Sequence, residues 1–203
     1  YIDERDGLTG KDIVKRQKLV SELKQRAKNN DFKTALNDLI EEVAYTWFNR
    51  IIAIRFMEVN DYLPSRTRVL SSSEGRNEPD IMVHPLSNDL LMDKLGGLTD
   101  DEQKIIIRAE DTEATIDQDV AYRMLFIKQA NALNANLPYL FEPTNDYAEL
   151  LFTPNYHDGV IQHLIHDISE DDFNVAVGGQ VEIIGWLYQY YNSEPHDQVI
   201  NIT

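Results

Sequence analysis

Cysteine is absent from the 203 residues of the chain. This absence excludes disulfide bonds, thiolate catalysis and zinc sites with cysteine ligands. Long apolar runs are also lacking: the stretch 43–59 is interrupted by Asn49, Arg50 and Arg55, so it falls short of the roughly 18 apolar residues of a membrane span. No basic and apolar leader opens the chain, so we expect no signal peptide and a cytoplasmic location.

Positive charge is missing from the last third of the chain. No Lys or Arg follows Lys128, whereas eleven Asp and Glu follow Asn136, and the formal net charge is −16. DNA-binding surfaces neutralise phosphates with Lys and Arg. The acidic C-terminal third is therefore excluded as a DNA-contacting surface by itself, and any DNA contact is expected within the first 76 residues. Residues 9–33 carry eight Lys or Arg against three acids.

The periodicity of apolar residues predicts a mainly α, bundle-like fold, a single helical domain over 1–203 with little or no sheet. A basic first helix is expected at 9–30 and a long core helix at 31–62. Polar residues predict a loop excursion around 65–98. Further helices are expected at 100–110, 113–136, 156–167 and 181–193, the first of them capped by Thr99 and Glu102. Only Ile105–Ile107 and Val175–Val177 have β-like composition.

The apolar positions of two of these helices are specific enough to be tested. The seam of the core helix is predicted to consist of Leu36, Leu39, Ile40, Val43, Trp47, Ile51 and Ile54. The stripe of the helix at 113–136 is predicted to consist of Val120, Leu125, Ile127, Ala130 and Leu133.

Three aromatic strings occur in order: AYTWFNRIIAIRFMEVNDYLPSRTRVLSS (44–72), LPYLFEPTNDYAELLFTPN (137–155) and VEIIGWLYQYYNSE (181–194). Together they resemble the N-terminal region of the adenine-specific DNA methyltransferases of BREX-type phage-resistance systems, which are similar to single-chain type II restriction–modification enzymes. The resemblance covers about residues 10–195. It implies that the chain is part of a longer protein whose methyltransferase domain, with its S-adenosylmethionine, lies downstream.

Catalytic motifs of such enzymes are missing here. An S-adenosylmethionine site needs a glycine-rich loop after a strand, and an N6-adenine enzyme needs an Asn/Asp-Pro-Pro-aromatic loop for the flipped base. The nearest string is TPNY (153–156), which lacks the Pro-Pro pair. No catalytic, cofactor-binding or metal-binding residue is therefore assigned, and the expected role is to position DNA or to dock partner subunits. Expected partners are DNA through the parent protein, the downstream domain and other defence-system proteins, but no membrane.

Two arginines in the middle of the core helix raise opposite expectations. Arg55 lies beside Ile51 and Val59 on the helix, which predicts a buried arginine paired with Glu58 or a distant acid. Arg50 lies on the polar face, either as a solvated charge or as a phosphate contact. The predicted DNA contacts are Lys11, Lys15, Arg16, Lys18, Arg50, Arg66, Arg68 and Arg76.

Two other classes of protein stay open. One is a pure protein–protein interaction module with an acidic surface. The other is a nuclease, since Pro79-Asp80 and Glu102-Gln103-Lys104 match a loose PD-(D/E)xK pattern. That pattern needs a strand, whereas Glu102 is predicted to begin a helix.

A group of histidines and a group of aromatic residues can each be interpreted as structural or as functional. His157, His163 and His166 are interpreted as surface histidines in preference to a metal site. Trp186 and its neighbouring tyrosines are interpreted as packing residues in preference to base-stacking ones.

Overall fold

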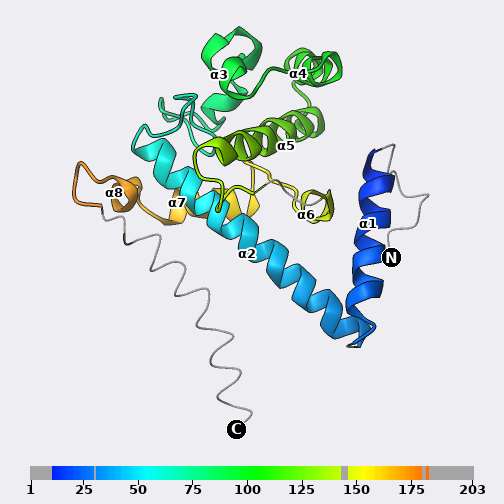
Figure 1. Ribbon diagram of the computed structural model, residues 1–203. Coiled ribbons are helices and arrows are strands. Elements are labelled where there is room, and N and C mark those ends of the chain that lie inside the picture. Colours follow the sequence, from blue (N-terminus) through cyan, green and yellow to red (C-terminus); the bar gives the residue numbers. More distant parts are fainter. Residues whose placement is uncertain (1–10, 30, 143–145, 180–181, 183–203) are drawn as a thin grey trace. The chain divides into compact units, whose positions relative to one another are not determined.

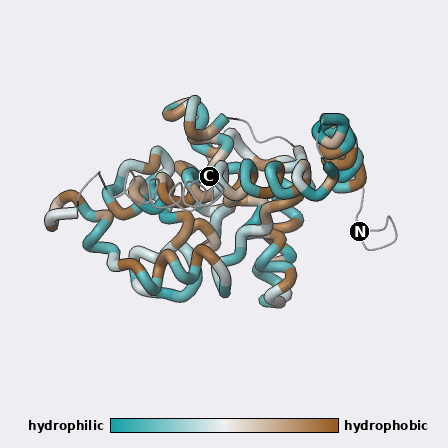
Figure 2. Tube along the Cα trace, turned by 90° about the horizontal axis from the view of Figure 1, so that it is seen from below, coloured by the Kyte–Doolittle hydropathy of each residue, from teal (hydrophilic) through white to brown (hydrophobic). Residues whose placement is uncertain are grey.

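The computed structural model describes residues 11–29, 31–142, 146–179 and 182. Within these residues the fold is mainly α, as predicted, and contains no strand (Figure 1). Figure 2 shows hydrophobic and hydrophilic residues interleaved along the helices, as in amphipathic helices. The α-helices are α1 (Lys11–Arg26), α2 (Phe32–Val59), α3 (Asp89–Lys94), α4 (Asp100–Thr112), α5 (Thr115–Ala132), α6 (Asp146–Leu151), α7 (Gly159–Asp167) and α8 (Glu170–Phe173). Three 3-10 helices accompany them: η1 (Asp80–Met82), η2 (Pro85–Ser87) and η3 (Leu133–Ala135).

The described residues divide into two compact units. One comprises residues 11–48 and 133–153, and the other comprises residues 49–132 and those from 154 onward. Helix α2 runs through both, because the division falls after Phe48. The predicted single domain over 1–203 stays a prediction. In the described residues, no helix has the length and apolar character needed to cross a membrane.

The first unit is built on α1, α6 and the first part of α2. Helix α1 packs against α6, and the Lys15 Nζ lies 3.0 Å from Glu149 Oε2. Trp47 is buried; its Nε1 donates to the Ala148 carbonyl at 3.1 Å and its ring stacks on Phe152. An indole that buries its rings while its N–H finds an acceptor combines apolar burial with a satisfied donor.

Helix α2 is close to its predicted span of 31–62. It begins after Asp31, whose Oδ1 accepts the backbone N–H groups of Lys33 and Thr34 as an N-cap does. It ends at Val59, because the Asn60 side chain donates to the Phe56 carbonyl and Asp61 turns left-handed with φ 56°.

The predicted seam of α2 is largely confirmed. Its buried members are Leu39, Val43, Trp47, Ile51 and Ile54. Leu36 is half-buried. Ile40 is 47% exposed, so its assignment to the seam was wrong.

The second unit contains α4 and α5, which pack side by side (Figure 1). The predicted capping box is confirmed: Thr99 Oγ1 accepts the Glu102 N–H, and the Glu102 carboxylate accepts the Thr99 N–H. The helix predicted at 113–136 is α5 followed by η3. Of its predicted stripe, Leu125, Ala130 and Leu133 are buried and Ile127 is half-buried. Val120 is 49% exposed, so its place in the stripe was wrong.

The excursion at 65–98 contains η1, η2 and α3 instead of loop alone. Its core residues Val69, Ile81 and Leu91 are buried, which ties this segment to the second unit. The helix predicted at 156–167 appears as α7, whereas the one at 181–193 lies outside the described residues except for Glu182. Ile105–Ile107 lies inside α4 and Val175–Val177 forms turns, so neither is a strand. Helices α6 and α8 were not predicted.

Candidate functional site at the end of helix α2

The predicted contacts on α1 lie in three kinds of surroundings. Lys15 pairs with Glu149 and is only 21% exposed at its side chain. Arg16 is half-buried and Lys18 is exposed. Lys11 begins α1, and its side chain lies outside the described residues. Of this group, Lys15 is already engaged by an acid of the same chain.

Arg50 is buried, with 3% of its surface exposed. The expectation of a solvated side chain at Arg50 was therefore wrong, whereas its assignment as a phosphate contact stays a prediction. Residues 50–56 are all buried, so this part of α2 is covered around its whole circumference and has no solvated polar face. Helical periodicity identifies a polar face but cannot show that the face is covered.

Arg55 confirms the prediction of a buried, paired arginine. It is 1% exposed, and its Nη1 donates to Glu58 Oε1 at 2.9 Å. Its Nη2 donates to Glu170 Oε2 at 3.2 Å, so the distant acid is also present. The guanidinium lies 5.9 Å from the centre of the Phe173 ring, within range of a cation–π contact. Burial of this charge is sustained by two carboxylates.

Glu58 holds the segment after α2 through hydrogen bonds to its backbone. Its Oε2 accepts the N–H groups of Val69 and Leu70 at 2.8 and 2.9 Å, and its Oε1 accepts the Ser71 hydroxyl at 2.9 Å. Burial raises the pKa of the Glu58 carboxyl, while Arg55 and the backbone donors oppose that rise. The carboxylate thus satisfies buried N–H groups that no helix or strand partner satisfies.

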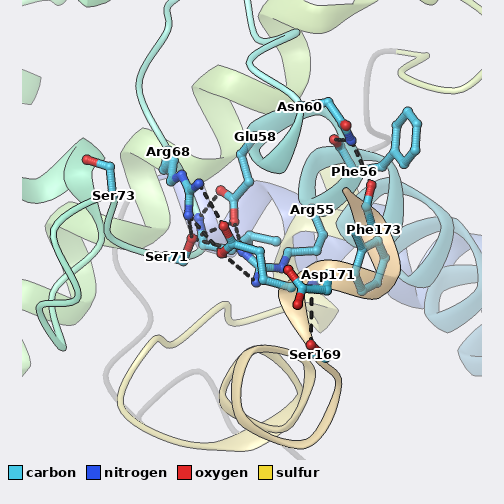
Figure 3. A network of polar contacts seen from close by, with 12 residues as sticks. Arg55, Phe56, Glu58, Asn60, Arg68, Ser71, Ser73, Ser169, Asp171 and Phe173 are labelled. Carbon is cyan, nitrogen blue, oxygen red and sulfur yellow. Dashed lines mark hydrogen bonds and ion pairs between the residues drawn. The ribbon is translucent and has the colours of Figure 1, made fainter. Parts of the chain in front are cut away.

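Arg68 is engaged by Glu170 in a bidentate pair. Its Nη1 and Nη2 donate to the two carboxylate oxygens at 2.9 Å each. The Arg68 guanidinium holds the pKa of the Glu170 carboxyl below its usual range, although partial burial opposes this effect. Figure 3 shows Arg55, Glu58 and Arg68 converging on Ser71. Two arginines therefore fix α8, which carries Glu170, to the end of α2.

Asn60 strengthens the attachment of α8. Its Nδ2 donates to the Phe173 carbonyl at 2.8 Å, and its Oδ1 accepts the Val175 N–H at 3.0 Å. The sequence predicted a distant acid for Arg55 but did not identify Glu170, because pairing between distant segments leaves no local pattern. The only local signal was Ser169, which caps α8 by accepting the Asp171 N–H.

The two remaining predicted contacts differ. Arg76 is exposed but pairs with Asp80 at 3.0 Å and with Glu74 at 3.4 Å. Arg66 is exposed, has a left-handed backbone with φ 49°, and makes no ion pair with any described residue. A hollow of about 230 Å³ is lined by Arg66 and Arg68, but also by Asp80. This surface is mixed in charge and not a basic patch.

The residues of the loose nuclease pattern are engaged elsewhere. Glu102 lies on α4, as predicted, and its carboxylate binds Lys128 at 3.0 Å. Lys104 pairs with Asp101, and Asp80 binds Arg76. Since the acid-x-Lys lies on a helix, the strand that the pattern requires is missing at this position.

The histidines belong to different local contacts. His163 Nδ1 lies 2.8 Å from Asp167 on its own helix, and His157 Nε2 lies 3.8 Å from Asp119. Across the described ranges, no three His, Cys, Asp or Glu side chains are grouped so that they could hold a metal ion. Trp186 and its neighbours lie outside those ranges.

Comparison with known proteins identifies relatives of this chain. No protein-family model matches. The chain is 59% identical over 197 residues to the adenine-specific methyltransferase PglX of Lacticaseibacillus casei (strain Zhang). The aligned region covers 97% of the chain and 16% of PglX. The chain is 38% identical over 193 residues to the adenine-specific methyltransferase BrxX of Escherichia coli O9:H4 (strain HS), which covers 93% of the chain and 14% of BrxX. The chain thus spans only about a sixth of the length of these relatives, and it is homologous to a segment of the PglX and BrxX adenine-specific methyltransferases.

Proposed function

We propose that the chain is a non-catalytic N-terminal helical module of an adenine-specific DNA methyltransferase of phage defence, acting in the cytoplasm. In this proposal it docks the rest of that protein or its partner subunits. The remaining length of the relatives leaves room for a catalytic domain downstream. S-adenosylmethionine does not fit the described residues, because they contain no strand followed by a glycine-rich loop. Cofactor binding and methyl transfer are therefore assigned to the downstream part.

One observation carries the preference for docking over DNA contact: half of the eight predicted phosphate contacts are buried or paired within the chain. Arg50 is buried, Arg68 and Arg76 pair with Glu170 and Asp80, and Lys15 pairs with Glu149. A cation that already faces a carboxylate releases little free energy when a phosphate replaces that carboxylate. Together with a net charge of −16, this pairing supports a surface that meets proteins.

A second candidate function, positioning of DNA, is favoured by α1 alone. Residues 11–28 carry seven Lys or Arg against two acids, and Lys18, Lys24 and Lys28 are exposed. Phosphate contacts from such a helix would orient DNA without reading its sequence. In this alternative, Arg66 is the one contact to be expected from the segment after α2.

The test measures both activities on the same protein. Association of the chain with the separately produced remainder of its parent methyltransferase is followed by size-exclusion chromatography and calorimetry. Binding of a fluorescent DNA duplex is followed by anisotropy across a salt series. Docking predicts association with the remainder and little DNA binding at physiological salt. Salt-sensitive DNA binding that is lost in the variant Lys18→Glu, Lys24→Glu, Lys28→Glu, with no association, would replace it with the DNA-positioning role.

A further inference from the structure

A groove of about 290 Å³ lies in the second unit, between η1 and η2 on one side and α4 and α5 on the other. Its floor is apolar and consists of Met82, Ile106, Ala109 and Leu125. All four are core residues of this unit, and most of their surface is covered by other core side chains. Ligand pockets for cofactor-sized molecules begin at about 300 Å³. The groove lies at the lower end of that range and has room for one or two side chains.

The rim of the groove is acidic. Glu78, Glu110 and Glu113 line it, and no Lys or Arg does. Among the described residues the one basic group at this rim is His84, whose Nδ1 lies 3.4 Å from Glu110 and whose side chain is 80% exposed. The nearby cations of α4 are used elsewhere, because Arg108 pairs with Asp117. The negative charge of the rim is therefore left uncompensated by lysine or arginine.

Helix α4 adds to this negative potential. It ends at Thr112, and its last turn contains no basic residue. The C-terminal end of a helix carries partial negative charge, so Lys or Arg is normally favoured there. Here Glu110 lies in that last turn, and Glu113 follows as the C-cap with a left-handed φ of 51°. A cation delivered from outside the unit would relieve this repulsion.

The chemistry of one kind of side chain fits both features. Arginine and lysine bury an aliphatic stem along apolar surface while their charged heads stay at the polar edge. The stem would lie over Met82 and Ala109, and the head would meet Glu110 and Glu113. Nucleic acid is disfavoured by the charge of the rim. An acidic segment would be repelled for the same reason.

We propose that this groove docks a basic segment of a partner protein, which inserts an arginine or lysine flanked by apolar residues. The inference rests on the docking function proposed above and specifies the chemistry of the partner and the surface that receives it. The groove belongs wholly to the second unit and shares no lining residue with the arginine network around Glu58.

The first experiment uses two capped peptides as probes, added to the chain with labelled Ile, Leu and Met methyl groups. One peptide alternates leucine and arginine, and the other has glutamate in place of each arginine. We expect the basic peptide to shift the methyl resonances of Met82, Ile106 and Leu125. Equal shifts from the acidic peptide, or none from either, would overturn the proposal.

A charge-matched pair of variants separates the groove from general electrostatics. Glu110→Gln with Glu113→Gln removes two negative charges at the rim, whereas Asp38→Asn with Asp172→Asn removes two exposed charges elsewhere. We expect at least fivefold weaker binding of the basic peptide by the rim variant and unchanged binding by the control. Urea unfolding verifies that both variants fold. Equal weakening in the two variants would refute a specific site.

The same variants distinguish failure of this inference from failure of the proposed function. If the chain associates with the remainder of its parent and the rim variant binds the basic peptide as tightly as the control does, the groove inference is wrong while docking stands. If no association occurs with any form of the chain, docking within this protein is wrong, and the peptide result alone decides whether the groove accepts a basic side chain.

Discussion

Basic residues occur both on α1 and in the segment that follows α2, and DNA contacts are predicted in both regions, yet the cations of the two regions lie in different surroundings. On α1, Lys24 and Lys28 are exposed and make no ion pair with any described residue. After α2, Arg68 meets both oxygens of Glu170, an acid more than a hundred residues away. A helix satisfies its own backbone, so its exposed cations need no partner, although Lys15 of α1 does pair with Glu149. An irregular segment packed on a core has buried N–H groups and charges that need acceptors, and here Glu58 and Glu170 supply them.

The largest effect is expected from breaking the network at Glu58. In Glu58→Ala, Arg55 loses its buried partner and the N–H groups of Val69 and Leu70 lose their acceptor. We expect the free energy of unfolding to fall by about 3–5 kcal/mol, measured by urea denaturation. Asp38→Ala, on an exposed face of the same helix, is the control and should change it by less than about 0.5 kcal/mol. A similar small loss in both would mean that the network does not stabilise the fold.

Removal of the Asn60 side chain should loosen α8 while the rest of the unit stays folded. Asn60→Ala removes the hydrogen bonds to the Phe173 carbonyl and the Val175 N–H, together with the bond to the Phe56 carbonyl at the end of α2. We expect a loss of roughly 1 kcal/mol in unfolding free energy and faster amide exchange at Val175. Asn37→Ala, exposed on α2, should leave both unchanged. If exchange at Val175 is unaffected, α8 is held by the arginines alone.

Acid should weaken the attachment of α8 through Glu170. Because Arg68 lowers the pKa of Glu170 in the folded chain, its contribution to stability is present above the unfolded pKa of about 4.5 and is lost as the pH falls through the folded value. Glu170→Gln should therefore flatten the decline in unfolding free energy between about pH 5 and pH 3, by less than about 1 kcal/mol because this carboxyl is partly exposed.

The measurement of this pH dependence has to allow for Glu58. Its raised pKa makes its contribution to the free energy of unfolding larger at lower pH, opposite to that of Glu170, but this contribution is the same in the variant and in the unaltered chain. Asp172→Asn, an exposed neighbour of Glu170, serves as the control. Parallel declines in Glu170→Gln and the unaltered chain would show that Glu170 does not contribute.

The smallest effects are expected on α1. Lys15→Ala should cost about 0.2–1 kcal/mol because the pair with Glu149 is lost, and a double-mutant cycle with Glu149→Ala isolates that coupling. Lys24→Ala should stay within about 0.5 kcal/mol of zero. A loss at Lys24 as large as at Lys15 would remove the contrast between paired and exposed cations on this helix.

Local signals predicted most of the helices. The Thr99–Glu102 capping box placed the start of α4, and the apolar spacing placed most of the buried face of α2. The same spacing misassigned Ile40 and Val120 to the core, because periodicity identifies a stripe but not its edges. Helices α3, α6 and α8 were missed because six, six and four residues are too few to carry a 3.6-residue period.

The sequence alone determined the helical class, the segregation of charge and the resemblance to BREX-type methyltransferases, because composition, periodicity and aromatic strings are properties of neighbouring residues. It also determined that Arg55 must be paired, since an unpaired buried guanidinium is too costly. Only the tertiary structure decided that Glu170 is the distant partner, that Arg50 is covered and that an acidic groove opens between η1, η2, α4 and α5. Each of these depends on which distant segments pack together. Such long-range burial and charge pairing produce no recognisable pattern in the sequence, because sequence patterns reflect only neighbouring residues.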